Sequence, residues 1–136
     1  MNRDLKIGKR YRHFKLKYYR TIALYDSSII GDGTLNTEEY RDYVVNVTDA
    51  LTDEPVKVLV TKWELKDIPH QIIITDKKGV RLQGLYVLYT ALYAPYQFYV
   101  RKVENFMSLT DKVKYPECSQ EYRFEYADIW HPLTFK

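Results

Sequence analysis

Residues 8–24 read GKRYRHFKLKYYRTIAL, and this stretch decides the expected fold. Between residues 10 and 15 large side chains alternate with basic ones, so Tyr11, His13 and Lys15 share one face of an extended chain. Residues 18–24 are rich in aromatic and β-branched side chains, which favours a second strand. With Leu16 and Lys17 at the turn, the stretch predicts a β-hairpin.

Short strand-like segments and turns continue along the rest of the chain. Strands are expected at residues 42–48, 56–65, 71–75, 80–93, 97–103 and 121–126. The first two form a hairpin in this scheme, because residues 52–55 (TDEP) make only a short turn between them. Helical turns are expected only at residues 36–40 and 104–109, and the tail 128–136 is expected to dock onto the body. Many short strands with intervening turns are typical of a β-barrel or β-sandwich.

Length and composition suit one β-rich domain, residues 1–136, with its own core. The chain has 136 residues, the usual size of one domain, and 46% of them are hydrophobic. The expected core consists of Phe14, Ile22, Leu88, Leu92, Val100, Phe106 and Phe124. Tyrosine is abundant, with 14 Tyr against 5 Phe. Tyrosine suits both the half-buried margin of a β-core and a recognition surface, and both interpretations stay open.

The charge distribution favours an anionic partner. The net charge is only +3, but in residues 1–20 many Lys and Arg residues stand against a single acid, Asp4. Such local asymmetry attracts anions even when the whole chain is only mildly basic.

The cysteine content and the distribution of apolar residues predict a cytosolic protein without a membrane partner. Cys118 is the only cysteine, so no intramolecular disulfide can form, which fits a reducing compartment. Residues 1–20 lack the apolar core of a secretory signal, and no apolar run reaches membrane-spanning length.

The chain carries no motif that specifies catalysis, a metal or a cofactor. His13, His70 and His131 lack metal-ligand spacing, and there is no second cysteine. Glycine-rich phosphate loops and the Gly-x-Ser-x-Gly elbow are also missing. We therefore expect a non-enzymatic protein without cofactor, and a small hydrolase is the minority alternative.

Basic and aromatic side chains are interleaved in the first hairpin and again in two later strands. Arginine offers a planar fork for phosphate, and tyrosine offers a face on which a base can stack. The alternative is a solvated basic face over the edge of an aromatic core. The candidate ligand-binding residues are Arg10, Tyr11, Arg12, His13, Tyr18, Arg20, Tyr99, Arg101 and Arg123.

Two blocks of the sequence carry short motifs in a fixed order. The first block is GKRYRHFK at residues 8–15, followed by the strand-like residues 18–24. The second contains YTALY at residues 89–93, YVR at 99–101, Phe106, and RF at 123–124. Together these motifs resemble a prokaryotic family, the domain of unknown function numbered sixteen fifty-three. The family's usual Gly after His-Phe-Lys is Leu16 here, its Trp is Tyr99, and its Pro is Lys102.

The resemblance implies an SH3-like small antiparallel barrel. The barrel would be formed by residues of about 9–24 and 85–126, with an inserted, hairpin-containing region at about 27–84. The family brings no known activity. Short proteins of this kind also occur in phage genomes, which would place the protein in a host cytoplasm.

The leading functional hypothesis is a binding module for an anionic, base-containing ligand. One form is a nucleotide-type signalling molecule, held in a pocket between protomers of a homo-oligomer and sequestered by a phage anti-defence protein. A second form is RNA or single-stranded DNA along an open barrel face. The alternative from another class is a protein-interaction module, an inhibitor or adaptor that binds a host protein through the inserted hairpin.

Overall fold

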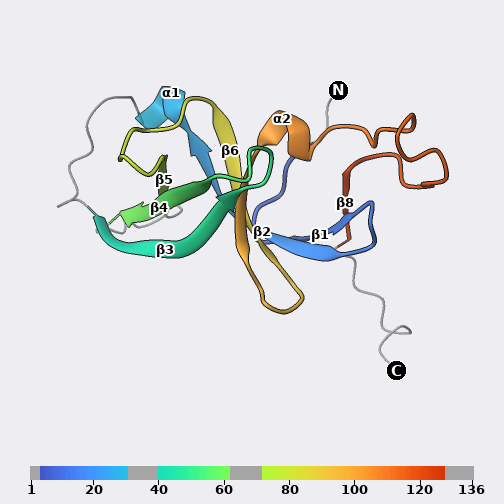
Figure 1. Ribbon diagram of the computed structural model, residues 1–136, viewed down its shortest axis with the longest axis horizontal. Coiled ribbons are helices and arrows are strands. Elements are labelled where there is room, and N and C mark those ends of the chain that lie inside the picture. Colours follow the sequence, from blue (N-terminus) through green and yellow to red (C-terminus); the bar gives the residue numbers. More distant parts are fainter. Residues whose placement is uncertain (1–3, 31–39, 62–71, 128–136) are drawn as a thin grey trace.

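The protein is mainly β, and its described residues form eight strands in one sheet and two single-turn helices (Figure 1). The computed structural model describes residues 4–30, 40–61 and 72–127. The strand order is β5-β4-β3-β7-β6-β2-β1-β8. The elements are β1 (Arg10–His13), β2 (Tyr18–Asp26), α1 (Ser27–Ile30), β3 (Tyr40–Asp49), β4 (Pro55–Thr61), β5 (Ile72–Thr75), β6 (Leu85–Ala91), β7 (Phe98–Lys102), α2 (Val103–Phe106) and β8 (Phe124–Tyr126).

The first hairpin forms as predicted, around a three-residue loop. The amide of Leu16 donates to the carbonyl of His13 over 2.7 Å, and the amide of His13 donates to the carbonyl of Lys17 over 2.8 Å. Leu16 has a φ of 64°, the left-handed conformation that ends this type of loop and that glycine adopts most easily. The turn therefore needs a left-handed residue at the position where the resembled family carries glycine.

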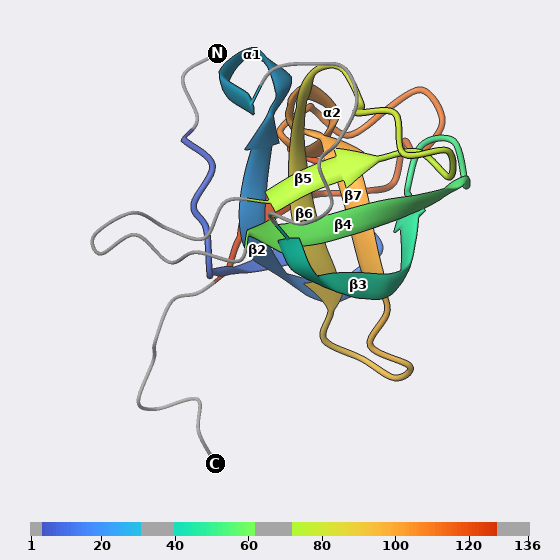
Figure 2. The ribbon, with the colours of Figure 1, turned by 90° about the vertical axis from the view of Figure 1, so that its left-hand side faces the viewer.

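Strands β2, β6 and β7 form the centre of the sheet, and β3 joins it in parallel to β7. Beyond β3 the sheet curls, so that β5, its first strand, packs against β2 (Figure 2). A hydrogen bond of 2.6 Å from the hydroxyl of Tyr25 on β2 to the carbonyl of Leu82 closes this side. The curled half encloses a core of aliphatic residues from β2 to β7, with Val58, Ile74 and Val100 fully buried.

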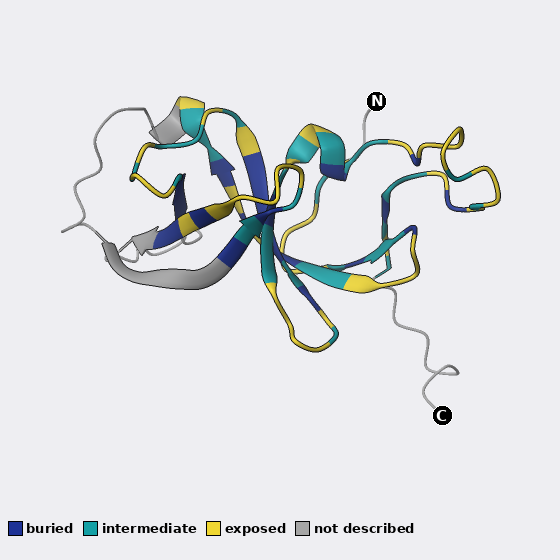
Figure 3. Ribbon diagram, viewed as in Figure 1, coloured by how far each residue is buried: buried dark blue, intermediate teal, exposed yellow. Residues whose placement is uncertain are grey.

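A second, aromatic core lies where β1, β8 and α2 meet β6. The rings of Phe106 and Phe124 stack with centroids 4.0 Å apart, and Tyr11 and Tyr89 each meet the Phe106 ring edge-on. All four side chains are buried, and in Figure 3 the buried residues of β6 continue from one half of the molecule into the other. The two cores thus share β6 as their common wall.

Most of the expected elements are present. The hairpin of residues 42–48 and 56–65 corresponds to β3 and β4, which pair antiparallel, and the helical turn at 104–109 corresponds to α2. Residues 36–39, 62–71 and the tail 128–136 lie outside the described residues.

Two of the seven expected core residues are not buried. Ile22 is 38% exposed, because the β2–β6 register shifts between Thr21 and Ala23 and turns the intervening side chain outward. Leu92 is 37% exposed, because β6 ends one residue earlier, at Ala91. The other five residues of the prediction are buried.

The region expected as an insertion contributes to the main sheet. Strands β3, β4 and β5 pair with one another, and residues 47–49 of β3 pair with β7. Within the described residues no helix is long and apolar enough to cross a membrane.

Candidate functional site

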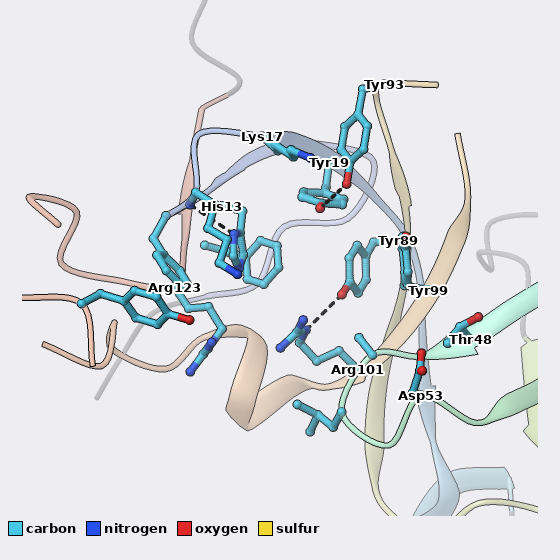
Figure 4. A pocket seen from close by; sticks show the side chains of 16 residues that line it. His13, Lys17, Tyr19, Thr48, Asp53, Tyr89, Tyr93, Tyr99, Arg101 and Arg123 are labelled. Atoms are coloured by element: carbon cyan, nitrogen blue, oxygen red, sulfur yellow. Dashed lines mark hydrogen bonds between the residues drawn. The ribbon is translucent and has the colours of Figure 1, made fainter. Parts of the chain in front are cut away.

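A hollow of about 460 Å³ opens beside the aromatic core, between the first hairpin and the β3–β4 turn (Figure 4). Residues 13–19, 48–53, 89–101 and 115–124 contribute to its walls. These segments are far apart in the sequence and meet only in the folded sheet. The lining residues are His13, Phe14, Lys15, Lys17, Tyr19, Thr48, Ala50, Leu51, Asp53, Tyr89, Tyr93, Tyr99, Arg101, Tyr115, Arg123 and Phe124.

Two arginines form the cationic side of the hollow. Arg101 donates from Nε to the hydroxyl of Tyr89 over 3.0 Å and from Nη1 to Oδ1 of Asn105 over 2.6 Å. Arg123 donates from Nε to the hydroxyl of Ser108 over 3.3 Å. In the described ranges neither guanidinium has an ion pair with a carboxylate. Burial, then the positive charge of Arg101, lowers the pKa of Arg123, and Tyr115 and Asp111 offset only part of this effect.

His13 lies beside these arginines at the end of β1. Burial, then Arg101, Arg123 and Lys15, lowers the pKa of His13 from 6.5 to about 4. The backbone amide of Lys15 donates to His13 Nδ1 over 3.2 Å, so the neutral ring carries its proton on Nε2. At neutral pH His13 is therefore an uncharged hydrogen-bond donor among cations.

Four tyrosines form an aromatic wall from β2 to β7. Tyr89 and Tyr99 stack with centroids 5.7 Å apart, and Tyr19 meets both rings edge-on. The hydroxyls of Tyr19 and Tyr93 are hydrogen-bonded at 2.6 Å. Burial and this hydrogen bond raise the pKa of Tyr19, so this part of the wall stays uncharged. Tyr99 keeps part of its surface exposed and is able to stack with a flat ring.

The β3–β4 turn forms the opposite rim and is fixed by hydrogen bonds. The carboxylate of Asp49 accepts a hydrogen bond from the amide of Leu51 over 2.9 Å, and the amide of Ala50 donates to the carbonyl of Val100 on β7 over 2.9 Å. This rim presents Thr48 and Asp53, which Figure 4 shows across the hollow from Arg123. Asp53 is the one acid among the described lining residues.

Four of the nine candidate residues from the sequence line this hollow. They are His13, Tyr99, Arg101 and Arg123. Tyr11 lies one layer deeper, in the aromatic core, with 1% of its surface exposed. The fold thus brings the first hairpin next to β7, which carries Arg101, and to Arg123, which directly precedes β8.

The other four candidate residues lie on the opposite face of the first hairpin. The register pairs Arg10 with Arg20 and Arg12 with Tyr18, whereas Tyr11 pairs with Tyr19 on the face of the core. Each of these arginines is bonded locally: Arg10 to the carbonyl of Ala127, Arg12 to Oε1 of Gln120, and Arg20 to the carbonyl of Gly8. Arg10, Arg12, Tyr18 and Arg20 are called the outer hairpin face below.

Several lining residues were not among the sequence candidates. Tyr19 and Lys15 follow from the alternation that places them on the face of Tyr11 and His13, so the pattern contained a signal for them. Tyr89 and Tyr93 lie in the YTALY motif. For Asp53 the sequence offers no signal, because it reaches the hollow only through the pairing of β3 with β7.

Comparisons with known proteins identify no relative of this chain. No family model, curated protein or solved structure matches the chain. The resemblance to the prokaryotic family of unknown function therefore stays an expectation. In the described residues no three His, Cys, Asp or Glu side chains cluster in a way that could hold a metal ion.

Proposed function

We propose that the protein binds a small nucleotide-type anion in the hollow between the first hairpin and the β3–β4 turn. The observation that carries this proposal is the pair Arg101 and Arg123, two guanidinium groups without a carboxylate partner in the described chain, next to a wall of tyrosines. One side suits phosphate, and the other suits a base.

The energetics favour an anion at the cationic side. Two partly buried guanidinium groups lie near His13, and burial, then the positive charge of the neighbouring arginines, lowers the pKa values of His13 and Arg123. A phosphate between them would balance this positive charge and form charge-assisted hydrogen bonds, each worth about 1.5–3 kcal/mol. The fold already holds the two cations by Tyr89, Asn105 and Ser108, which lowers the entropic cost of binding.

The size of the hollow favours a small ligand over a polymer. Its volume of about 460 Å³ falls within the usual range for sites of small molecules, about 300–1,000 Å³. A strand of RNA or DNA needs a longer basic track, and the outer hairpin face, where further arginines lie, is separated from the hollow by the hairpin itself. The small-ligand form of the hypothesis is therefore preferred.

The protein would act without catalysis, sequestering its ligand in the cytosol, and a second copy of the chain would close the open side of the hollow. We further propose that one part of the sheet corresponds to an SH3-like barrel. This part consists of β1, β2, β6, β7 and β8, and the open sheet continues from it into β3.

Calorimetric titration against cyclic and linear nucleotides and short oligonucleotides tests this proposal. We expect a nucleotide to bind, and Arg101→Ala or Arg123→Ala to weaken binding roughly ten- to hundredfold. Arg20→Ala is the matched control, because it removes the same charge from the outer hairpin face and should leave the affinity unchanged. The melting temperature of each variant reports whether the fold is intact.

Two results would contradict the proposal. The first is that no nucleotide binds the wild type below about a millimolar, which would leave the protein-interaction alternative. The second is oligonucleotide binding that falls steeply with salt and is weakened by Arg20→Ala, which would favour a polynucleotide on the outer hairpin face.

A further inference from the structure

The hollow has opposite charges on its two sides. Arg123 and Arg101 provide the cationic side, and the carboxylate of Asp53 lies on the β3–β4 rim across from Arg123 (Figure 4). Tyr99, whose ring is partly exposed, lies on the side of the hollow where Asp53 stands (Figure 4), and burial, then Tyr93 and the negative charge of Asp53, raise the pKa of Tyr99. A ligand that filled the hollow would therefore meet cations at one end and an acceptor at the other.

The β3–β4 turn fixes the backbone of Asp53, whose side chain is exposed. Its amide donates to the carbonyl of Asp49 over 2.8 Å, and its φ of 62° is left-handed. In the described part of the chain no hydrogen bond or ion pair engages its carboxylate. The carboxylate is thus available to accept hydrogen bonds from a ligand.

The chemistry of a carboxylate distinguishes the bases. Guanine presents two neighbouring donors, N1–H and the 2-amino group, which match the two oxygens of one carboxylate. Adenine and cytosine present an amino group beside a ring nitrogen that is an acceptor and would repel a carboxylate. Uracil presents a single N–H between two carbonyl oxygens.

On this basis we propose that the hollow selects guanine nucleotides, with Asp53 accepting the N1–H and 2-amino donors of the base while the phosphate lies at Arg101 and Arg123. This inference rests on the proposed function and deepens it by naming the base. The base would stack on Tyr99, between the rim and the arginines.

Titration of guanosine, inosine, adenosine and uridine monophosphates with the wild type, Asp53→Asn and Glu54→Gln tests the inference. We expect the wild type to bind the guanosine compound roughly ten- to hundredfold more tightly than the adenosine compound. Inosine monophosphate keeps N1–H but lacks the 2-amino group, so its affinity should lie between the two. Asparagine tolerates the left-handed conformation at least as well as aspartate, so Asp53→Asn should fold normally.

Asp53→Asn should lose the preference for guanosine monophosphate and leave adenosine monophosphate binding unchanged or stronger. Glu54→Gln removes a neighbouring charge that does not line the hollow, and it should keep the wild-type preference. Equal binding of the guanosine and adenosine compounds, or a preference that survives in Asp53→Asn, would overturn the guanine assignment and leave the proposed function standing. If none of the four binds, and no other nucleotide does, the proposed function itself fails.

Discussion

Arg101 on β7 donates a hydrogen bond from Nε to the hydroxyl of Tyr89 on β6, over 3.0 Å. Tyr89 is 2% exposed and packs against Phe106 and Phe124, so its hydroxyl is held by the aromatic core. The bond fixes a cation of the hollow to the buried aromatic core. The position of the guanidinium is thereby determined before any ligand arrives.

Tyr89→Phe should weaken ligand binding about three- to tenfold, because Arg101 loses the acceptor that holds its Nε while the ring stays in the core. The free energy of unfolding should fall by only about 1 kcal/mol. The matched control is Tyr25→Phe, which removes a hydroxyl bonded to Leu82 in the other core and should leave binding unchanged. Calorimetry and urea unfolding measure both effects. An unchanged affinity in Tyr89→Phe would mean that this bond does not position Arg101.

Phe124→Ala should destabilise the protein by about 3–5 kcal/mol, because it removes a buried ring that stacks on Phe106 at 4.0 Å and leaves a cavity. Val113→Ala is the control, since Val113 is 95% exposed and its truncation should cost less than about 0.5 kcal/mol. Urea unfolding of both variants provides the comparison. A loss below about 1 kcal/mol for Phe124→Ala would show that the aromatic cluster contributes little to stability.

Local patterns made the first hairpin and most strands predictable. The alternation in residues 10–15 gives the two faces of β1, and the β3–β4 hairpin follows from a short turn between two strand-like segments. Long-range pairing had no such signal. The parallel contact of β3 with β7 depends on the packing of strands far apart in the sequence, and it joins β3, β4 and β5 to the rest of the sheet.

The sequence predicted the kind of ligand that the candidate site would bind better than it predicted which residues form the site. Interleaved arginines and aromatics indicated an anion-binding surface, but sequence proximity grouped Arg12 and His13, which the register places on opposite faces of the hairpin. The bulge between Thr21 and Ala23 likewise turned Ile22 outward, although its residue type predicted burial.

Leu16→Gly should stabilise the protein by about 0.5–1 kcal/mol, because Leu16 has a φ of 64° and an exposed side chain that contributes little packing. Leu16→Ala keeps the Cβ atom and its left-handed strain, so it should bring no gain. Thermal unfolding of the two variants separates the backbone effect from the loss of the side chain. Equal stabilities for the Gly and Ala variants would contradict the strain argument.

Stability should fall on acidification from about pH 6.5 towards pH 4, and His13 should account for part of the fall. The folded pKa of His13 is about 4, below the ordinary value of 6.5, so in this range the unfolded chain binds a proton that the folded chain excludes. The contribution is fully present above pH 6.5 and amounts to roughly 1–2 kcal/mol once screening of the partly exposed ring is allowed for.

Urea unfolding of the wild type and His13→Gln at pH 7 and pH 4.5 measures this contribution. The variant should lose a smaller amount of stability between the two pH values, because glutamine does not titrate. If the two proteins respond equally to pH, the imidazole does not titrate in this range, and the positive environment of the hollow is weaker than the structure indicates.

Arg123→Lys should recover little of the affinity lost in Arg123→Ala. Arg123 lines the hollow and is held through Nε by Ser108, so this bond leaves its two Nη groups for a ligand. Lysine keeps the positive charge, but it offers a single ammonium group that cannot bond two phosphate oxygens in a plane. We therefore expect the Lys variant to bind a nucleotide within about threefold of the Ala variant and at least tenfold more weakly than the wild type.

Lys17→Arg is the control for this prediction. Lys17 lies over the Tyr93 ring at 4.7 Å, a contact that arginine also makes, so the affinity of this variant should stay near the wild-type value. Calorimetry at one ionic strength measures the nucleotide affinity of the wild type and of the three variants Arg123→Ala, Arg123→Lys and Lys17→Arg. If Arg123→Lys binds like the wild type, charge alone holds the phosphate, and the fork has no part in recognition.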